Sequence, residues 1–197
     1  MPRVSAEHLE RRRQQILDGA RICFVRRGFH ETSMQDIFRE SGLSAGAVYR
    51  YFKSKDEIIR AIVAYNQGLI GGLLGEILGE ETLPPLEEVM SRFAGRLIAM
   101  LGGPDGALRI APQGWAQAVH DKEFAPIVRE LFSDTRQLWI KLAVRLRDDG
   151  RLAPDADPEA VGAMLLCLMP GFILQYLLLD DVDERTVRAG IHGLVAR

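Results

Sequence analysis

Apolar residues recur every three to four positions along most of the chain, and no segment shows the strict alternation of a β-strand. In the first such segment Ile16, Ala20, Cys23 and Phe24 follow this spacing. The spacing places their side chains on one face of an α-helix. The sequence therefore predicts an all-α fold, with no internal repeats and no low-complexity segments.

Capping residues, glycines and prolines divide the pattern into separate helices. The predicted helices cover residues 5–27, 33–42, 45–52, 54–79, 85–101, 107–119, 121–149, 157–179 and 183–196. Pro112 and Gly114 fall inside one of them and are expected to kink or split it, because proline removes a backbone donor and clashes with the preceding turn.

The segment from Thr32 to Lys55 predicts a helix-turn-helix. Ser33 and Asp36 have the spacing of a capping box, and Gly42 can end the first helix in the left-handed conformation. Ser44 can then cap the second helix. Two short helices joined by such a turn can set one across the DNA phosphates and the other in the major groove.

Residues 42–59, GLSAGAVYRYFKSKDEII, resemble the signature of the tetracycline-repressor (TetR) family of bacterial transcriptional regulators. The matching positions are G-L-S-x-G-x-x-Y-x-Y-F-x-S-K-x-E-x-I. The rest of the chain resembles the family only in helix layout and length. The resemblance implies a DNA-binding domain at residues 1–53 and a ligand-binding and dimerisation domain at residues 54–197. An amphipathic helical hairpin with incidental basic residues is the alternative.

The motif positions imply a set of contacts to double-stranded operator DNA. Small residues at the start of the second helix let its backbone approach the base edges, and the later hydroxyl and ammonium groups can reach phosphates. Hydrogen-bond readout of bases must come from residues other than the two alanines, which offer only methyl groups, and Gln35 and Arg50 are the candidates. Packing between helices is the alternative for Tyr49. The predicted DNA-binding residues are Ser33, Gln35, Ser44, Ala45, Ala47, Tyr49, Arg50, Tyr51 and Lys55.

Charge is distributed unevenly, although the net charge is only −2. Residues 1–55 contain 11 Lys and Arg against 6 Asp and Glu, and the remainder contains 14 against 21. An anionic partner is therefore expected at the N-terminal quarter. The run Arg11–Arg13 either lies near DNA or forms the solvated face of its helix, and we favour the solvated face.

The body of the chain is expected to hold a largely apolar or aromatic small molecule, as the family resemblance implies. Its helices supply aromatic and thioether side chains with a few polar groups, which suits such a cavity. Ordinary core packing is the alternative for each residue. The predicted ligand-binding residues are Phe93, Leu97, Met100, Trp115, His120, Phe132, Arg136, Trp139, Met169, Phe172 and Gln175.

No cofactor, metal site or catalytic constellation is expected. Cys23 and Cys167 lie in apolar helical patterns without zinc-ligand spacing and are predicted to be reduced core residues. The four histidines are scattered, and no phosphate-binding glycine loop occurs. An enzyme is therefore the weakest of the function classes considered.

The segment Ala160–Leu179 contains no charged residue and is long enough to span a bilayer. Pro170, Gly171 and Gln175 within it favour a buried subunit interface instead. With no secretion signal at the N-terminus, we expect a cytoplasmic protein without a membrane segment. The family resemblance implies a homodimer through residues 157–180 and 183–196.

These observations predict a two-domain homodimeric repressor that binds a palindromic operator and is released by a small ligand. The alternative is a constitutive or protein-regulated DNA-binding protein without an inducer. The glycines at 68, 71, 72 and 75 bear on this choice, because they weaken the helix that links the two domains. They serve either signalling through a soft helix or the close packing of a neighbouring helix.

Overall fold

Helices make up all of the regular secondary structure in residues 6–103 and 106–195, which the computed structural model describes. The elements are α1 (Ala6–Glu31), α2 (Met34–Ser41), α3 (Ala45–Val48), α4 (Lys55–Leu78), α5 (Leu86–Leu101), the 3₁₀ turn η1 (Ala107–Arg109), α6 (Ala111–His120), α7 (Ala125–Asp148), α8 (Pro158–Leu178) and α9 (Glu184–Val195). The predicted all-α fold is confirmed. The predicted cap at Ser5 and the end of the last helix at Ala196 lie outside the described residues.

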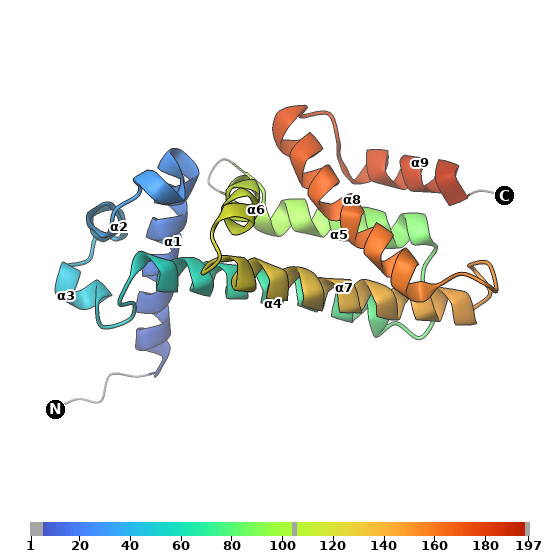
Figure 1. Ribbon diagram of the computed structural model, residues 1–197, viewed down its shortest axis with the longest axis horizontal. Helices are drawn as coiled ribbons and strands as arrows, with labels where there is room; N and C mark the ends of the chain where they lie inside the picture. The colour runs from blue at the N-terminus through green and yellow to red at the C-terminus, as the bar shows by residue number, and fades with distance from the viewer. Residues whose placement is uncertain (1–5, 104–105, 196–197) are drawn as a thin grey trace.

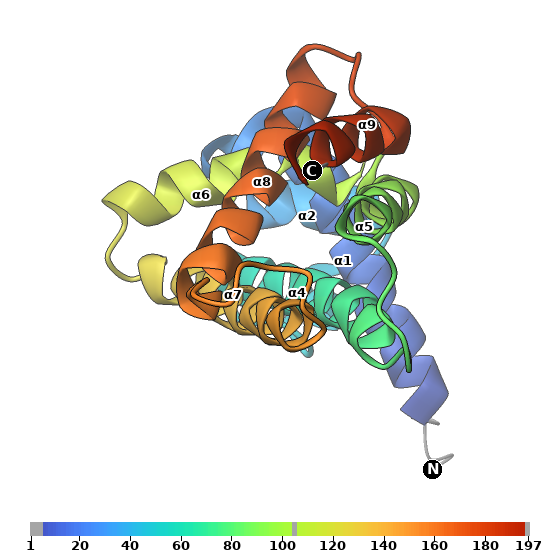
Figure 2. The same ribbon diagram turned by 90° about the vertical axis from the view of Figure 1, so that its right-hand side faces the viewer.

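The molecule is elongated, with α1–α3 gathered at one end and the other helices extending away from them (Figure 1). We call α1–α3 the head and α4–α9 the body. In the body α4 runs beside α7, α8 packs most extensively on α7, and α9 lies along α5. Figure 2, turned by a quarter, shows α8 crossing above α4 and α7.

The head is shaped by glycines where the sequence predicts them. Gly28 leaves the helical conformation at φ 81° and ψ 170°, so the regular part of α1 ends after Arg27 as expected. Gly42 ends α2 in the left-handed conformation at φ 67°. A side chain would be strained at both positions.

The helix α3 is shorter than predicted and ends at Val48 instead of Phe52. Its last turn loosens there, because the N–H groups of Tyr51 and Phe52 both donate to the carbonyl of Val48, at 2.9 and 3.1 Å. This turn brings the ring of Phe52 into the core of the head, where it is buried.

The irregular segment around Pro112 splits as predicted, into η1 and α6, with Pro112 in the first turn of α6. The next helix begins later than predicted. The carboxylate of Asp121 accepts hydrogen bonds from the N–H groups of Glu123 and Phe124, at 2.9 and 3.1 Å, and α7 starts at Ala125. Asp121 therefore stabilises the turn before α7 and is not part of that helix.

The glycines of α4 do not interrupt it, and close packing does not explain most of them. A Cβ added at Gly68, Gly72 or Gly75 would meet no described atom within 4 Å. Only Gly71 faces a neighbour, with Leu138 of α7 at 3.9 Å. Within the described structure, the close-packing alternative therefore applies to Gly71 and not to the other three glycines.

The helix α8 is buried on one side only. Gly162 lets it approach α7 so closely that an added Cβ would lie 2.8 Å from the backbone nitrogen of Ile140. On its other side Met164, Leu168 and Leu174 are exposed. Cys167 is also exposed, so the prediction that it is a core residue is wrong, whereas Cys23 is buried as predicted.

By length and composition, both α4 and α8 could cross a membrane, and the prediction named only the second. Both helices pack against α7, and core helices of soluble proteins pass the same test of length and hydropathy.

Candidate DNA-binding and ligand-binding sites

The start of α2 is fixed by a reciprocal capping box. The hydroxyl of Ser33 donates to Asp36 Oδ2 at 2.6 Å, and the backbone N–H of Asp36 donates to the hydroxyl oxygen at 3.2 Å. The side chains of Arg27 and Arg39 each lie 2.9 Å from Asp36 Oδ1. The hydrogen bonds from Ser33, supported by the two arginines, lower the pKa of Asp36. In this conformation the Ser33 hydroxyl proton is donated to Asp36 and is not available to a phosphate.

The helix α3 presents small side chains at the surface of the head. Ser44 caps it by accepting a hydrogen bond from the N–H of Ala47 at 3.3 Å, which leaves its hydroxyl proton free for another acceptor. Ala45 and Gly46 are exposed and Ala47 is half-buried. A base edge or phosphate can therefore approach the α3 backbone closely.

Two of the predicted DNA-binding side chains have no partner in the described part of the chain. Gln35 and Arg50 are exposed and make no hydrogen bond or ion pair within the described part of the chain. Tyr49 packs its ring edge-on against Phe38, with 5.4 Å between centroids, but is still 43% exposed. The packing alternative for Tyr49 thus applies to its ring, but this contact does not bury the residue. Tyr51 is half-buried.

Lys55 lies differently from its predicted role. Its ammonium group donates to the carbonyl oxygens of Phe29 at 2.5 Å and Thr32 at 3.0 Å, with His30 at 3.5 Å. These carbonyls follow the regular part of α1, where a cation is favourable. In this conformation the side chain fastens α4 to the end of α1 and does not reach outward to a phosphate.

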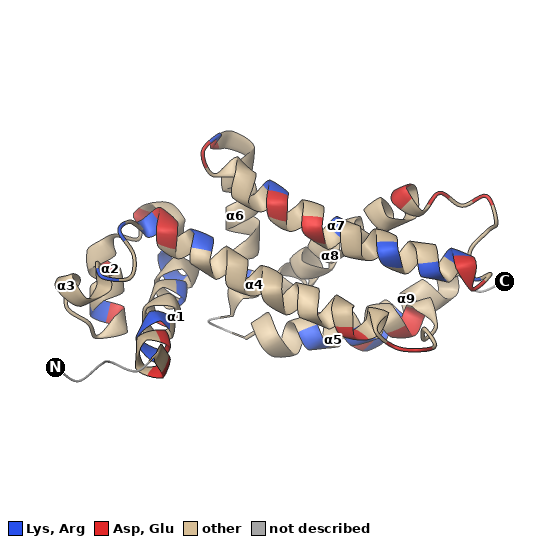
Figure 3. Ribbon diagram, turned by 90° about the horizontal axis from the view of Figure 1, so that it is seen from below, with Lys and Arg blue, Asp and Glu red and all other residues tan. Residues whose placement is uncertain are grey.

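Lys and Arg alternate with Asp and Glu along α1 (Figure 3), and in its arginine run Arg11 is exposed whereas Arg12 and Arg13 are half-buried. Arg11 pairs with Glu7 at 2.6 Å, and Arg12 donates to Gln15 at 2.9 Å. The guanidinium group of Arg13 stands 5.5 Å from the ring centroid of Phe52. All three arginines are therefore engaged within the head.

The body contains a small inner cavity of about 70 Å³ beneath the head. Of the predicted ligand-binding residues, Leu97, Trp115 and Met169 line it. Phe29 also lines it, although this residue belongs to α1 of the head. The inner cavity is lined by Phe29, Ile59, Ile62, Val63, Asn66, Ile70, Leu97, Leu101, Ala107, Leu108, Ile110, Ala111, Gly114, Trp115, Val128, Leu131, Met169 and Ile173.

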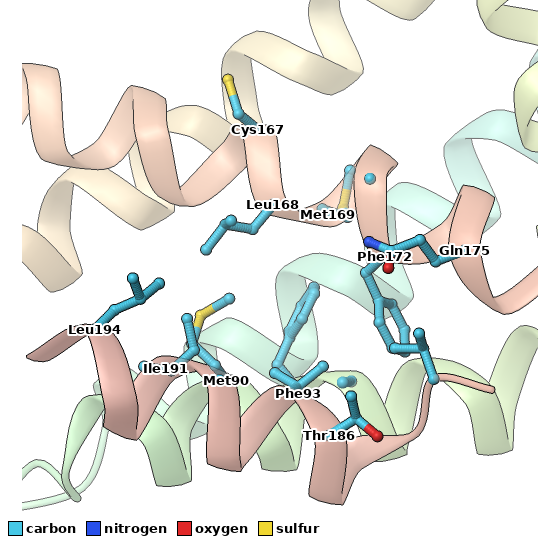
Figure 4. A pocket seen from close by; sticks show the side chains of 15 residues that line it. Met90, Phe93, Cys167, Leu168, Met169, Phe172, Gln175, Thr186, Ile191 and Leu194 are labelled. Atoms are coloured by element: carbon cyan, nitrogen blue, oxygen red, sulfur yellow. The ribbon is translucent and has the colours of Figure 1, made fainter.

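A second, more open site is the outer groove between α5, α8 and α9, with a volume of about 310 Å³. Figure 4 shows Leu168 of α8 and Leu194 of α9 on its two sides, above Met90 of α5. Four predicted residues line this groove: Phe93, Met169, Phe172 and Gln175. The predicted ligand set is thus divided between two sites, and Met169 borders both.

The other predicted ligand residues lie elsewhere. Trp139 is fully buried and packs edge-on against Phe93, with 5.1 Å between centroids, and Phe132 packs against Trp115 at 5.9 Å. Met100 and His120 border open depressions at the surface, and Arg136 is exposed and lines none of the cavities described. For Arg136 the cause is helical geometry, because Thr135 and Trp139 form the inward face of α7.

Fifteen of the eighteen residues that line the inner cavity were not predicted, and two of these, Asn66 and Phe29, differ in whether the sequence could have revealed them. Asn66 interrupts the apolar series Ile62, Asn66, Ile70, and a polar residue on an apolar stripe was a signal that could have revealed it. Phe29 gave no such signal, because its contact with the cavity depends on how the head sits on the body.

Comparison with known proteins agrees with this architecture. Residues 16–62 match the model for bacterial regulatory proteins of the tetR family, and residues 86–197 match the model for the C-terminal part of BetI-type transcriptional repressors. The HTH-type transcriptional repressor Rv1474c of Mycobacterium tuberculosis is 27% identical over 181 residues, which are 84% of this chain and 95% of that protein.

Solved structures share the fold at lower sequence identity. GusR of Salmonella enterica superposes with a TM-score of 0.76 at 21% identity over 100% of both chains. SmeT, in a complex with triclosan, superposes with a TM-score of 0.78 at 20% identity, over 93% of this chain and 91% of that one. Because the two family models together match both the head and most of the body, the chain belongs to the TetR family of bacterial transcriptional regulators.

Proposed function

We propose that this DNA-binding regulator is a cytoplasmic, homodimeric repressor that a small, largely apolar molecule releases from a palindromic operator. Residues 1–53 would bind the operator, and residues 54–197 would bind the ligand and the second subunit. The observation that carries the proposal is the place of Phe29, a residue of the head whose side chain lines the inner cavity of the body.

The DNA-binding part of the proposal rests on the accessible groups around α3. Ala45 and Gly46 are exposed and small, which suits close approach of α3 to a major groove. Arg50 and Gln35 make no hydrogen bond or ion pair with the described residues, so their side chains are available to bases. Arg50 can donate two hydrogen bonds to one guanine, and Gln35 can pair with an adenine. The hydroxyl groups of Ser44, Tyr49 and Tyr51 are suited to phosphates.

The homodimer rests on the uncovered apolar surface of α8 and α9. Leu174 is 40% exposed, Leu178 75% and Leu194 80%, although each is a large apolar side chain. Such a surface on a soluble protein usually marks an interface. A two-fold axis through it would pair two heads, which explains why the operator should be a palindrome.

Ligand control rests on the size and walls of the inner cavity. At about 70 Å³ it is well below the roughly 300–1,000 Å³ of typical ligand sites, so its walls must move apart to admit a ligand. Phe29 is one of those walls, and its carbonyl holds Lys55 at the start of α4. A ligand that displaces the ring of Phe29 would therefore change how the head is fastened to the body. The complex of SmeT with triclosan supports a small-molecule role for a body of this fold.

An operator-release assay tests the proposal. Operator DNA is found by footprinting the region upstream of the gene itself, and compounds are then screened for release. An inducer should quench or shift Trp115 fluorescence at the concentrations that release the operator, with Trp115→Phe as the control that isolates Trp139. Operator should weaken inducer binding by the same factor by which inducer weakens operator binding, with a coupling of about 1–3 kcal/mol.

Two outcomes would count against it. An inducer that binds Trp115→Ala with full affinity would place the ligand site elsewhere, and the outer groove at Phe93 would be the next candidate. If the operator is bound but no compound releases it, the protein is a constitutive or protein-regulated repressor.

A further inference from the structure

The described side chains that line the inner cavity offer hydrogen-bonding groups at only two places, the amide of Asn66 and the indole N–H of Trp115. None of the described residues that line it carries a charge, and all but Asn66 are aliphatic, aromatic, thioether or glycine. An ionised group moved into such a cavity would lose its hydration and gain no counter-charge. The lining therefore selects against charged molecules.

Asn66 carries the only amide side chain in this lining, and the amide has no hydrogen-bond partner among the described residues. It is half-buried on α4 between Ile62 and Ile70 and makes no hydrogen bond with any described residue. The neighbouring amide, Gln67, points elsewhere and donates to Asp134 Oδ2 of α7 at 2.5 Å. The two adjacent amides of α4 thus have different surroundings. Gln67 joins α4 to α7, whereas Asn66 borders the cavity without a hydrogen-bond partner.

We propose that the inner cavity selects an uncharged molecule with an apolar body and one hydroxyl or carbonyl group, which hydrogen-bonds the Asn66 amide. An asparagine amide can donate or accept, so either group fits. This inference rests on the proposed function, because it assigns the chemistry of the ligand and the residue that recognises it.

A cationic side chain nearby defines the competing possibility. Arg21 lines an open depression together with Tyr65 and Met100, and this depression shares Leu101 and Ala107 with the wall of the inner cavity. Its Nε is buried and has no hydrogen-bond partner in the described structure, although its Nη2 lies 3.1 Å from Asp18. An acidic ligand would be drawn to Arg21, outside the inner cavity, and not to Asn66.

Three matched probes separate these possibilities by calorimetric titration of the full-length protein: 4-propylphenol, propylbenzene and 4-propylbenzoate. We expect 4-propylphenol to bind best. Asn66→Leu should weaken its binding about tenfold, the usual worth of one hydrogen bond, and leave propylbenzene binding unchanged or tighter. Gln67→Leu, the matched control on the same helix, should leave the affinity for 4-propylphenol unchanged. The carboxylate probe should bind at least about a hundredfold more weakly than the phenol.

The inference is overturned if 4-propylphenol does not bind at millimolar concentration, if Asn66→Leu binds it as tightly as the wild type, or if the carboxylate binds equally well. Loss of carboxylate binding in Arg21→Gln would then assign the site to the outer depression. Operator binding and release, measured on the same variants, keep the proposed function separate. If a charged inducer releases the operator equally well from the wild type and from Asn66→Leu, the proposed repressor function is retained and only this inference is wrong.

Discussion

The ammonium nitrogen of Lys55 lies 2.5 Å from the carbonyl oxygen of Phe29, while the ring of the same phenylalanine lines the inner cavity. Lys55 is the first residue of α4, and Phe29 follows the glycine that ends the regular part of α1. One residue of the head is therefore in contact with both the linking helix and the cavity proposed to bind the ligand. Phe29 therefore connects the proposed ligand-binding cavity with the start of the helix that links the head to the body.

Replacing Lys55 by Met tests whether its charge serves the protein or the DNA. Because the ammonium group donates to carbonyl oxygens at the end of α1, we expect the free energy of unfolding to fall by about 1 kcal/mol. This value is below the roughly 1.5–3 kcal/mol of a hydrogen bond to a charged group, because the site is partly exposed. The salt dependence of operator binding should stay that of the wild type. A slope lower by about one would show instead that Lys55 turns outward to a phosphate in the complex.

Arg50 and Gln35 are expected to read bases. Changing either to Ala should alter sequence preference, with a loss of about 1–3 kcal/mol at one base position of each half-site. Arg11→Ala is the matched control, because Arg11 is basic and in the head but is paired with Glu7. Affinities measured over a set of single-base operator variants would reveal the change. Uniform weakening across the set would place Arg50 or Gln35 on the phosphate backbone.

The dimer interface is tested by introducing a charge into α8. Leu174→Arg should give monomers or aggregates, since a charge at a buried apolar interface would have no partner. Val119→Arg makes the same change at a more exposed apolar residue, 77% against 40%, on α6, and should remain a dimer. Sedimentation velocity distinguishes the states. A folded Leu174→Arg dimer would move the interface away from this face of α8.

The glycines of α4 offer a test of the linking helix. Gly72→Ala should raise the free energy of unfolding by about 0.5–1 kcal/mol, because the site is open and alanine favours the helix. If softness of α4 serves signalling, the same change should reduce the coupling between inducer and operator. Ala64→Gly, at an exposed site of α4, should have the opposite effect on stability and should not reduce the coupling. An unchanged coupling in Gly72→Ala would make the softness of α4 irrelevant to release.

The stabilisation that the capping box of α2 gives to the fold should depend on pH. The pKa of Asp36 is lowered in the folded state, so the unfolded state binds a proton more readily. The stabilisation is therefore complete above the ordinary aspartate pKa of about 3.9 and disappears as the pH falls through the lowered value. Asp36→Asn should be less stable than the wild type at about pH 6. The free energies of unfolding of the two proteins should converge as the pH falls through the lowered pKa of Asp36. Urea midpoints at both pH values measure the difference, and a constant difference would exclude the carboxylate as its source.

The features that the sequence predicted well are local ones. The Ser33 cap, the Gly42 turn and the split at Pro112 depend on a few neighbouring residues, whose backbone preferences are known. The features it missed depend on contacts between distant segments. Lys55 faces α1 instead of solvent, and Phe29 meets the cavity, only because the head folds against the body.

The candidate ligand set shows the same limit. Helical spacing identified apolar faces but could not distinguish a face that borders a cavity from one that fills the core, as Trp139 does. Nor could it show that Phe93 and Leu97, one turn apart on α5, border different sites. That division depends on how α5 is placed between α4 on one side and α9 on the other.

The small volume of the inner cavity also has a kinetic consequence. A ligand that cannot fit about 70 Å³ must wait until thermal motion widens the walls, so binding follows a conformational opening. The observed association rate should then level off at high ligand concentration, at the rate of opening. In a cell that suddenly meets a large amount of inducer, release of the operator would be no faster than the opening of the cavity.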